Sequence, residues 1–168
     1  MTNAIVLMGV SGCGKTVVGT RLSEILGWPF FDGDDFHPEE NIAKMSQGIP
    51  LNDEDRTTWL ANLHDLIAEH LKGDKSMLLA CSALKQKYRD QLCKDNPGTI
   101  FVYLKGSYDL ILDRMQNRSS HYMKMDMLQS QFETLEEPNE ALVVNIDQSI
   151  EEIIRRIIQT LGLDFSME

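Results

Sequence analysis

The sequence predicts an α/β fold in which five parallel strands form a doubly wound sheet with helices on both faces. Three observations support this prediction: five short apolar runs, helical periodicity between the runs, and turn residues where helices should stop. Short, nearly continuous apolar runs are typical of parallel strands that are covered on both faces. The runs that we expect to be strands are residues 4–8, 29–31, 77–80, 100–104 and 141–146.

Helical patterns fill the gaps between these runs. Gly27 and Gly73 stand where the first two helices should end, and Asn52 or Asp53 is a candidate cap for the second. A regular alternation of strand and helix favours a parallel sheet. Apolar residues three or four positions apart predict helices around residues 18–26, 59–71, 110–115 and 150–161.

Length and composition limit the classes of function. A chain of 168 residues is the size of one ordinary domain, so we expect a single domain over residues 1–168. No apolar run approaches the roughly 20 residues of a membrane helix, and no signal-peptide pattern opens the chain. We therefore expect a cytoplasmic protein with no membrane partner. The net charge of −10 argues against a nucleic-acid partner.

The three cysteines, Cys13, Cys81 and Cys93, match no zinc-binding spacing. We expect them to be buried or half-buried free thiols.

The first apolar run leads directly into GVSGCGKT, residues 9–16, which matches the P-loop pattern in full. Glycines let the backbone turn its N–H groups toward phosphate oxygens, and the following helix directs its positive end at the same anion. We expect Lys15 to reach the β- and γ-phosphates and Thr16 to offer its hydroxyl to Mg²⁺. The alternative is a glycine-rich turn with an incidental lysine. We predict a nucleotide site formed by Gly9, Val10, Ser11, Gly12, Cys13, Gly14, Lys15 and Thr16.

Nucleotide binding does not by itself define a function. The chain lacks the Asn-Lys-x-Asp segment with which a GTPase reads its base, and it is too short for a large ATPase module. A small chain with one P-loop and five strands is typical of a kinase that acts on a small molecule, with a mobile lid over the site. The acceptor should then bind elsewhere along the same edge of the sheet.

An acidic segment follows the second apolar run and is the first candidate for the acceptor side. Asp32 is suited to bind Mg²⁺ directly or through water, and Asp34 to orient the acceptor hydroxyl or accept its proton. His37 is a candidate substrate contact, and Pro38 suits the first turn of a following helix. The alternatives are an acidic turn in which Asp35 caps that helix, and a surface position for His37.

Basic residues farther along the chain are candidates for binding an anionic acceptor. Arg56, inside the acidic cluster of residues 52–55, either neutralises that cluster or clamps a carboxylate through two parallel hydrogen bonds. Lys85 and Arg89 lie one helical turn apart, so a helix that begins near Ser82 would place both on one face. The alternative for this pair is a solvated basic surface.

Two more arginines lie at the segment that we interpret as a lid, about residues 117–126: Arg114 precedes it and Arg118 lies within it. Arg114 and Arg118 lie four residues apart on a predicted helix. A lid arginine that closes on the transferring phosphoryl group would stabilise its charge and exclude water. The alternative is that both are ordinary arginines on a helix surface.

Five segments together resemble the bacterial gluconate kinases, or gluconokinases, in that family's order and spacing. They are GVSGCGKT, FFDGDDFHPEENIAKMSQGIPLNDEDRTTWL, CSALKQKYRD, VYLKG and QFETLEEP. The resemblance extends from about residue 4 to about residue 160. It implies a P-loop kinase fold similar to shikimate kinase and the nucleoside monophosphate kinases. It also implies transfer of phosphate from ATP, with Mg²⁺, to the 6-hydroxyl of D-gluconate, and a homodimer.

The resemblance also implies roles for individual residues. Asp32 and Asp34 match the family's Asp-Gly-Asp, near Mg²⁺ and the acceptor hydroxyl, and residues 145–148 would pass the adenine. The family has an aspartate where this sequence has Asn145 and a proline where it has Ser149. At the position of Cys13 the family often has a serine. Our candidates are Lys15, Asp34 and Arg118 for catalysis, Asp34, His37, Arg56, Lys85 and Arg89 for the acceptor, and Arg114 and Asp147 for the nucleotide beside the P-loop.

Two rival functions remain open at this point. One is a kinase for shikimate or another hydroxy acid, which a panel of acceptors would separate from a gluconate kinase. The other is a regulatory module that binds a nucleotide and phosphorylates nothing. A protein that has lost its activity is a third possibility, which the intact P-loop and aspartates argue against.

Overall fold

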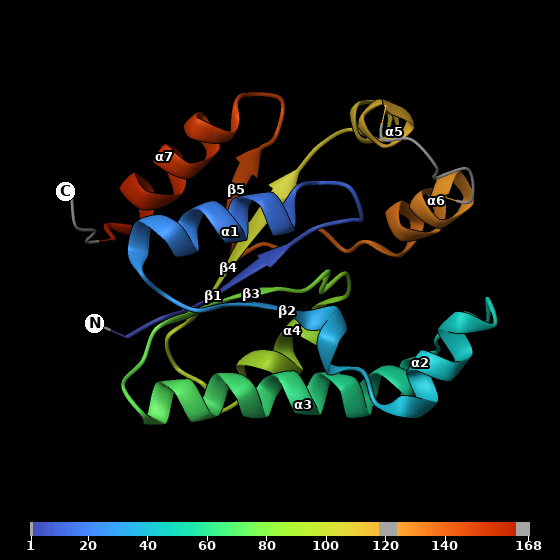
Figure 1. Ribbon diagram of the computed structural model, residues 1–168, viewed down its shortest axis with the longest axis horizontal. Helices are drawn as coiled ribbons and strands as arrows, with labels where there is room; N and C mark the ends of the chain where they lie inside the picture. Colours follow the sequence, from blue (N-terminus) through green and yellow to red (C-terminus); the bar gives the residue numbers. More distant parts are fainter. Residues whose placement is uncertain (1, 118–123, 164–168) are drawn as a thin grey trace.

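Five parallel strands form the central sheet of the computed structural model, which describes residues 2–117 and 124–163 (Figure 1). The order across the sheet is β2-β3-β1-β4-β5, and every pairing is parallel. The doubly wound α/β fold is confirmed, and each strand end lies within one residue of its predicted position. The strands are β1 Ala4–Met8, β2 Phe30–Asp32, β3 Met77–Ala80, β4 Thr99–Lys105 and β5 Leu142–Asn145.

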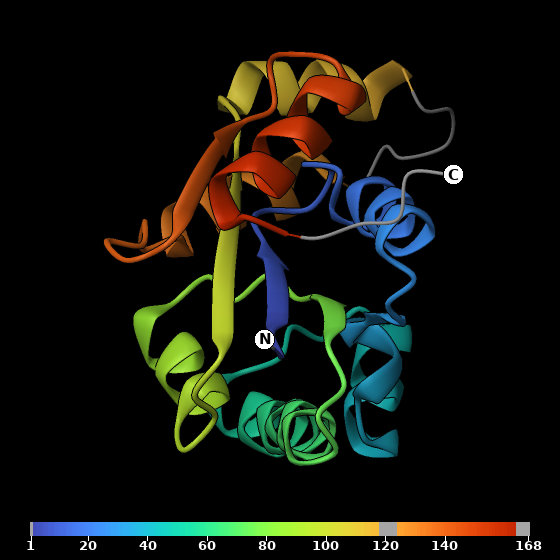
Figure 2. The same cartoon turned by 90° about the vertical axis from the view of Figure 1, so that its left-hand side faces the viewer.

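Two hydrophobic cores lie on the two faces of the sheet, and β1 contributes alternate side chains to them. Ile5 and Leu7 pack in the core that contains helices α1 (Lys15–Leu26) and α7 (Ile150–Leu161). Val6 and Met8 pack in the core that contains α3 (Asp53–Lys72) and α4 (Gln86–Cys93). Figure 2 shows α1 and α7 above the sheet and α3 and α4 below it. Burial on both faces explains why the strands are almost entirely apolar.

The remaining helices lie at the end of the sheet toward which the strands point, on the right of Figure 1. A short 3₁₀ turn, η1 (Gly33–Phe36), follows β2 directly and leads into α2 (Glu39–Ser46). Helices α5 (Tyr108–Asn117) and α6 (Lys124–Thr134) lie on the other side of this end, where Tyr108 and Phe132 pack edge to face. None of the helices in residues 2–117 and 124–163 is long and apolar enough to cross a membrane.

The structure shows which residue caps the N-terminus of α3. Asn52 is the cap, because its side chain accepts the N–H of Asp55 at 2.8 Å while the Asp55 carboxylate accepts the N–H of Asn52 at 3.0 Å. This reciprocal pair satisfies two N–H groups at the start of the helix. Asp53 is therefore free to direct its carboxylate elsewhere.

The prediction of a helix from about Ser82 is wrong. The chain after β3 stays irregular until α4 begins at Gln86, because Ala83 takes a left-handed conformation at φ 46° and Lys85 is extended. Lys85 therefore precedes the helix that carries Arg89. The two residues do not share a helical face.

Candidate active site

The P-loop connects β1 to α1 in a conformation that requires glycine. Gly9, Gly12 and Gly14 have φ values of 146°, 82° and 103°, in the region that side chains disfavour. A β-carbon at Gly9 would lie 2.8 Å from Cys13 Sγ and 3.0 Å from the Leu104 carbonyl oxygen. The predicted sequence of strand, loop and helix is therefore present with the geometry that the motif demands.

The cationic end of Lys15 lies inside this loop. Its Nζ donates to the carbonyl oxygens of Gly9 at 2.8 Å and Val10 at 3.1 Å. Gly14 precedes α1 and supplies no side-chain cap, so the first turn keeps its N–H groups available for an anion. Thr16 is exposed in that same turn. The loop thus offers an ammonium, a helix N-terminus and a hydroxyl to one ligand.

A contact from the far end of the chain holds the P-loop from outside. Gln131, on α6, accepts the N–H of Ser11 with its Oε1 at 2.6 Å and donates from Nε2 to Ser11 Oγ at 2.9 Å. Sequence reasoning missed this residue, which is 120 positions from its partner. The one available signal was the segment QFETLEEP, which begins with it.

Asp32 and Asp34 follow β2 at the same edge of the sheet. Asp32 is the cap of η1 and accepts the N–H of Asp34 at 3.0 Å. The Asp34 side chain is 86% exposed, and its Oδ1 lies 4.0 Å from Nε2 of His37. Despite this exposure, desolvation by the surrounding residues and the charge of Asp32 raise the pKa of Asp34 above its usual range, whereas His37 and Lys15 oppose that rise. Pro38, not Asp35, is the residue that precedes α2, so the alternative role of Asp35 as a helix cap is wrong.

Arg56 and Lys85 are brought together around two residues that sequence reasoning did not select. The hydroxyl of buried Tyr88 donates to Asp53 Oδ1 and accepts from Arg56 Nη1 at 3.1 Å. Lys85 Nζ donates to the same carboxylate at 3.4 Å, and Lys87 binds its other oxygen. Arg56 and Lys85 each lie 5.7 Å from the centre of the Tyr88 ring. We call Asp53, Arg56, Lys85, Lys87 and Tyr88 the Asp53 cluster.

Hydrogen bonds and ion pairs organise the charges of the Asp53 cluster. Hydrogen bonds from Lys87, Tyr88 and Lys85 hold the pKa of Asp53 far below its usual range. Asp53 in turn raises the pKa of Lys87. Arg56, Lys85 and Lys87 therefore lie close together around one carboxylate, an arrangement suited to an anionic acceptor.

Arg89 lies apart from the Asp53 cluster. It is buried, and it donates to the carbonyl oxygens of Ala83 and Glu136, each at 2.7 Å. The Glu136 carboxylate also accepts the first N–H of α4, from Gln86, at 2.9 Å. Arg89 thus fixes the irregular turn that carries Lys85. This position favours a structural role and argues against direct contact with an acceptor.

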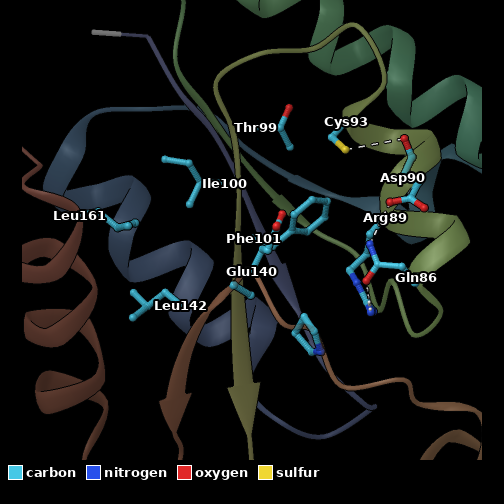
Figure 3. Close-up of a pocket in the computed structure, with 12 residues that line it drawn as sticks. Gln86, Arg89, Asp90, Cys93, Thr99, Ile100, Phe101, Glu140, Leu142 and Leu161 are labelled. Carbon is cyan, nitrogen blue, oxygen red and sulfur yellow. Dashed lines mark hydrogen bonds between the residues drawn. The ribbon is translucent and has the colours of Figure 1, made fainter.

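Figure 3 shows Arg89 among the residues that line a cavity, whose volume is about 390 Å³. Thr99 and Leu142, the first residues of β4 and β5, line this cavity. It therefore lies at the amino ends of these strands, whereas ligands of open parallel sheets bind at the carboxyl ends. The cavity belongs to neither half of the candidate site.

The residues expected near the nucleotide base lie beside the end of β5. Arg114, on α5, donates from Nη2 to the Ile146 carbonyl oxygen at 2.7 Å. The N–H of Asp147 bonds to the side chain of Asn145 at 2.8 Å, in an exposed turn. Arg118 and the segment 118–123 of the expected lid lie outside the described residues.

Comparisons with known proteins show the family to which this chain belongs. The shikimate kinase family model matches residues 11–162. The thermosensitive gluconokinase of Escherichia coli (strain K12) is 49% identical over 146 residues, 86% of this chain and 78% of the relative. The thermoresistant gluconokinase of the same organism is 46% identical, covering 93% and 91% of the two chains. This chain belongs to the shikimate kinase family and, within it, to the gluconokinases.

Solved structures support the gluconokinase assignment at the level of the fold. A gluconokinase from Sinorhizobium meliloti 1021 superimposes with a TM-score of 0.84 at 44% identity, over 95% of this chain and 91% of that one. A shikimate kinase from Bacteroides thetaiotaomicron reaches a TM-score of 0.69 at 17% identity over 96% of this chain and 99% of that one, which shows the shared fold alone. The resemblance on which the sequence analysis relied is confirmed.

Proposed function

We propose that this protein transfers the γ-phosphoryl group of ATP to the 6-hydroxyl of D-gluconate, giving 6-phospho-D-gluconate and ADP. One observation supports it above all: Asp34 Oδ1 lies 4.0 Å from His37 Nε2, the charge of Lys15 lowers the pKa of Asp34, and the charge of Arg56 lowers the pKa of His37. A phosphate-binding lysine, a candidate proton acceptor and a carboxylate-binding arginine thus form one continuous site.

The nucleotide side of the site is the P-loop, residues 9–16. Its backbone N–H groups and Lys15 would hold the phosphates, with Lys15 exchanging the carbonyl oxygens of Gly9 and Val10 for phosphate oxygens. Arg114 and Asp147 lie where the base would pass. This part of the proposal assigns ATP as the phosphoryl donor.

Mg²⁺ fits the oxygen atoms that lie beside the P-loop. Mg²⁺ usually takes one or two protein oxygens and completes its shell with phosphate oxygens and water. Thr16 Oγ1 and the Asp32 carboxylate are oxygen donors of this kind, and only one Asp32 oxygen is used by the N–H of Asp34. These two residues would hold the ion, which neutralises charge on the transferring phosphate.

Gluconate suits the acceptor side because its two functional ends are far apart. Its carboxylate is at one end of a six-carbon chain and the reacting hydroxyl is at the other. Arg56 and Lys85, in the Asp53 cluster, would bind the carboxylate, while the hydroxyl reaches Asp34. His37 would contact the chain between them.

Catalysis would then come from positioning and from neutralisation of charge. Asp34 aligns the hydroxyl or accepts its proton, and Lys15 and Arg118 stabilise the phosphoryl group. The expected lid, residues 117–126, lies largely outside the described residues. We further propose one domain over residues 1–168, a homodimer, and a location in the cytoplasm, with no nucleic-acid or membrane partner.

The decisive experiment is ADP release by the purified protein with MgATP, comparing D-gluconate, shikimate, a nucleoside monophosphate and no acceptor. Release that requires D-gluconate is the expected result. Release with another acceptor would overturn the substrate and leave the kinase assignment intact. ATP binding with no acceptor-dependent release would point to a regulatory module instead.

A further inference from the structure

Asn41 is a buried polar side chain to which neither the sequence motifs nor the proposed chemistry assigns a role. It lies on α2, is 2% exposed, and reaches both the start of α3 and the imidazole of His37. Its Nδ2 donates to the Asp55 carbonyl oxygen at 2.9 Å and lies 3.2 Å from His37 Nδ1. A buried amide that bonds to two specific groups restricts the positions and the hydrogen-bond roles of both groups.

The contact with Asp55 identifies the Asn41 atom as nitrogen. A backbone carbonyl oxygen only accepts hydrogen bonds, so the group that faces it must donate. An amide nitrogen carries two hydrogens, and the second is available to His37. Because that nitrogen cannot accept, His37 Nδ1 must be the acceptor, and the ring proton of neutral His37 lies on Nε2.

We propose that Asn41 is a positioning residue that holds His37 as a neutral imidazole protonated on Nε2, with this N–H directed toward the Asp34 carboxylate and the acceptor hydroxyl. The proposal deepens the proposed kinase function and rests on it for the meaning of Asp34. The separation of 4.0 Å between Nε2 and Asp34 Oδ1 is longer than a hydrogen bond. The N–H is therefore free to bond to a substrate oxygen at this point.

Stacking fixes the orientation of the ring, so the N–H has a defined direction. The His37 side chain is 5% exposed and stacks on Trp59 with ring centres 4.4 Å apart and planes 14° from parallel. Trp59 is itself anchored, since its Nε1 donates to the Gly33 carbonyl oxygen at 2.7 Å, directly after β2. The imidazole is thus held at its edge by Asn41 and on its face by Trp59.

The charged groups around His37 are compatible with a neutral ring. Arg56 faces it from α3 and Asp34 from η1, while the Asp55 carboxylate is turned toward Lys44 at 2.8 Å. Burial, the largest effect, and Arg56 lower the pKa of His37, and Asp34 opposes them. A pKa below the ordinary value of about 6.5 leaves the ring neutral at pH 7. A neutral donor orients oxygen atoms without cancelling the negative charge of Asp34.

The test reads the ring protons directly, without substrate. Long-range ¹H–¹⁵N NMR spectra of ¹⁵N-labelled protein distinguish protonated from unprotonated ring nitrogens. The signals of His37 are those that disappear in His37→Gln, which separates them from the other three histidines. We expect Nε2 protonated and Nδ1 unprotonated at pH 7. A ring protonated on Nδ1, or on both nitrogens, in the wild-type protein overturns the proposal.

Variants then test whether Asn41 is the cause. In Asn41→Ala we expect a mixture of the two neutral tautomers and a lower kcat with gluconate, with the KM for ATP unchanged. The matched control is Asn62→Ala, since Asn62 donates to the Phe36 carbonyl oxygen at 3.1 Å and has no bond to His37. An unchanged tautomer in Asn41→Ala, or an unchanged kcat despite a mixture, contradicts the role of Asn41. Absence of gluconate turnover in the wild-type protein would overturn the proposed function and leave the tautomer result standing.

Discussion

Replacing Tyr88 by phenylalanine tests whether the Asp53 cluster is the acceptor site. The substitution keeps the buried ring, and with it the contacts of the ring with Arg56 and Lys85 at 5.7 Å. It removes the hydroxyl that donates to Asp53 and accepts from Arg56 Nη1 at 3.1 Å. Arg56 then loses the one hydrogen bond that joins it to this cluster within the described residues, and it is held less firmly, by its ion pair with Asp53 Oδ1 at 4.0 Å and by the ring.

The size of the effect follows from the environment of Arg56. A hydrogen bond that involves a charged group contributes about 1.5–3 kcal/mol, and an ordinary one about 0.5–1.5 kcal/mol. The Arg56 side chain is 32% exposed, so water replaces part of the lost bond and about 1 kcal/mol is the appropriate figure. Because 1.4 kcal/mol corresponds to a factor of ten, we expect the KM for gluconate to rise roughly fivefold.

The assay measures ADP formation while gluconate and ATP are varied in turn. We expect the KM for ATP to stay within error of the wild-type value, because the hydrogen bonds of the Tyr88 hydroxyl go to Asp53 and Arg56 and not to the P-loop. Tyr103→Phe is the matched control: its buried hydroxyl also donates to a carboxylate, Glu137 at 3.2 Å, outside the Asp53 cluster. An unchanged KM for gluconate in Tyr88→Phe, or an equal rise in the control, would refute the reasoning.

Four further predictions follow from the same structure. Lys15→Ala should lower kcat at least about 100-fold, the usual cost of one preorganised donor, and retained activity would contradict the P-loop interpretation. Asp34→Asn should lower kcat at least about tenfold with ATP binding preserved, and near-normal turnover would remove Asp34 from the mechanism. Cys93 is exposed, so the expectation that all three thiols are buried or half-buried is wrong for it, and it should react with Ellman's reagent in the folded protein. Cys13 and Cys81 should react only on unfolding, because both are buried and burial raises the pKa of Cys81 to about 12; fast reaction of all three would contradict this. The lowered pKa of Asp53 stabilises the fold at pH values above the usual aspartate pKa of about 3.9, and this stabilisation is lost as the pH falls through the folded-state pKa. The free energy of unfolding of Asp53→Asn, measured with denaturant, should therefore depend less on pH in acid than that of the wild type. An equal dependence would be evidence against this prediction.

The strands and the P-loop were predictable because their signals are local. Each strand is buried on both faces and therefore reads as an apolar run, and GVSGCGKT contains its own glycines, lysine and hydroxyl. The start of α4 was not predictable. Ala83 has no local reason to adopt φ 46°, and its conformation is accompanied by a bond from Arg89 to its carbonyl oxygen, six residues along the chain. The sequence shows that residue 89 is an arginine, but not that its guanidinium donates to the carbonyl oxygen of Ala83.

The residues that sequence reasoning missed are those whose partners are distant. Tyr88 meets Asp53 across 35 positions, and Gln131 meets Ser11 across 120. No spacing rule relates such pairs, because they are neighbours only after the sheet has formed. The resemblance to gluconokinases included their segments without saying what each side chain contacts. Residues such as Arg56 were recognisable by type, whereas the groups that orient them required the fold.

If the Asp53 cluster is the acceptor site proposed above, the acidic residue at its centre has a physical reason. Arg56, Lys85 and Lys87 would repel one another if no negative charge lay between them, and long flexible side chains would move apart. Asp53 holds them together before the acceptor arrives, so less ordering remains to be done on binding. The capping pair of Asn52 and Asp55 makes this possible, because it satisfies the start of α3 without using the Asp53 carboxylate. A bound carboxylate would share these cations with Asp53, which favours an acceptor that brings hydroxyl groups as well as charge.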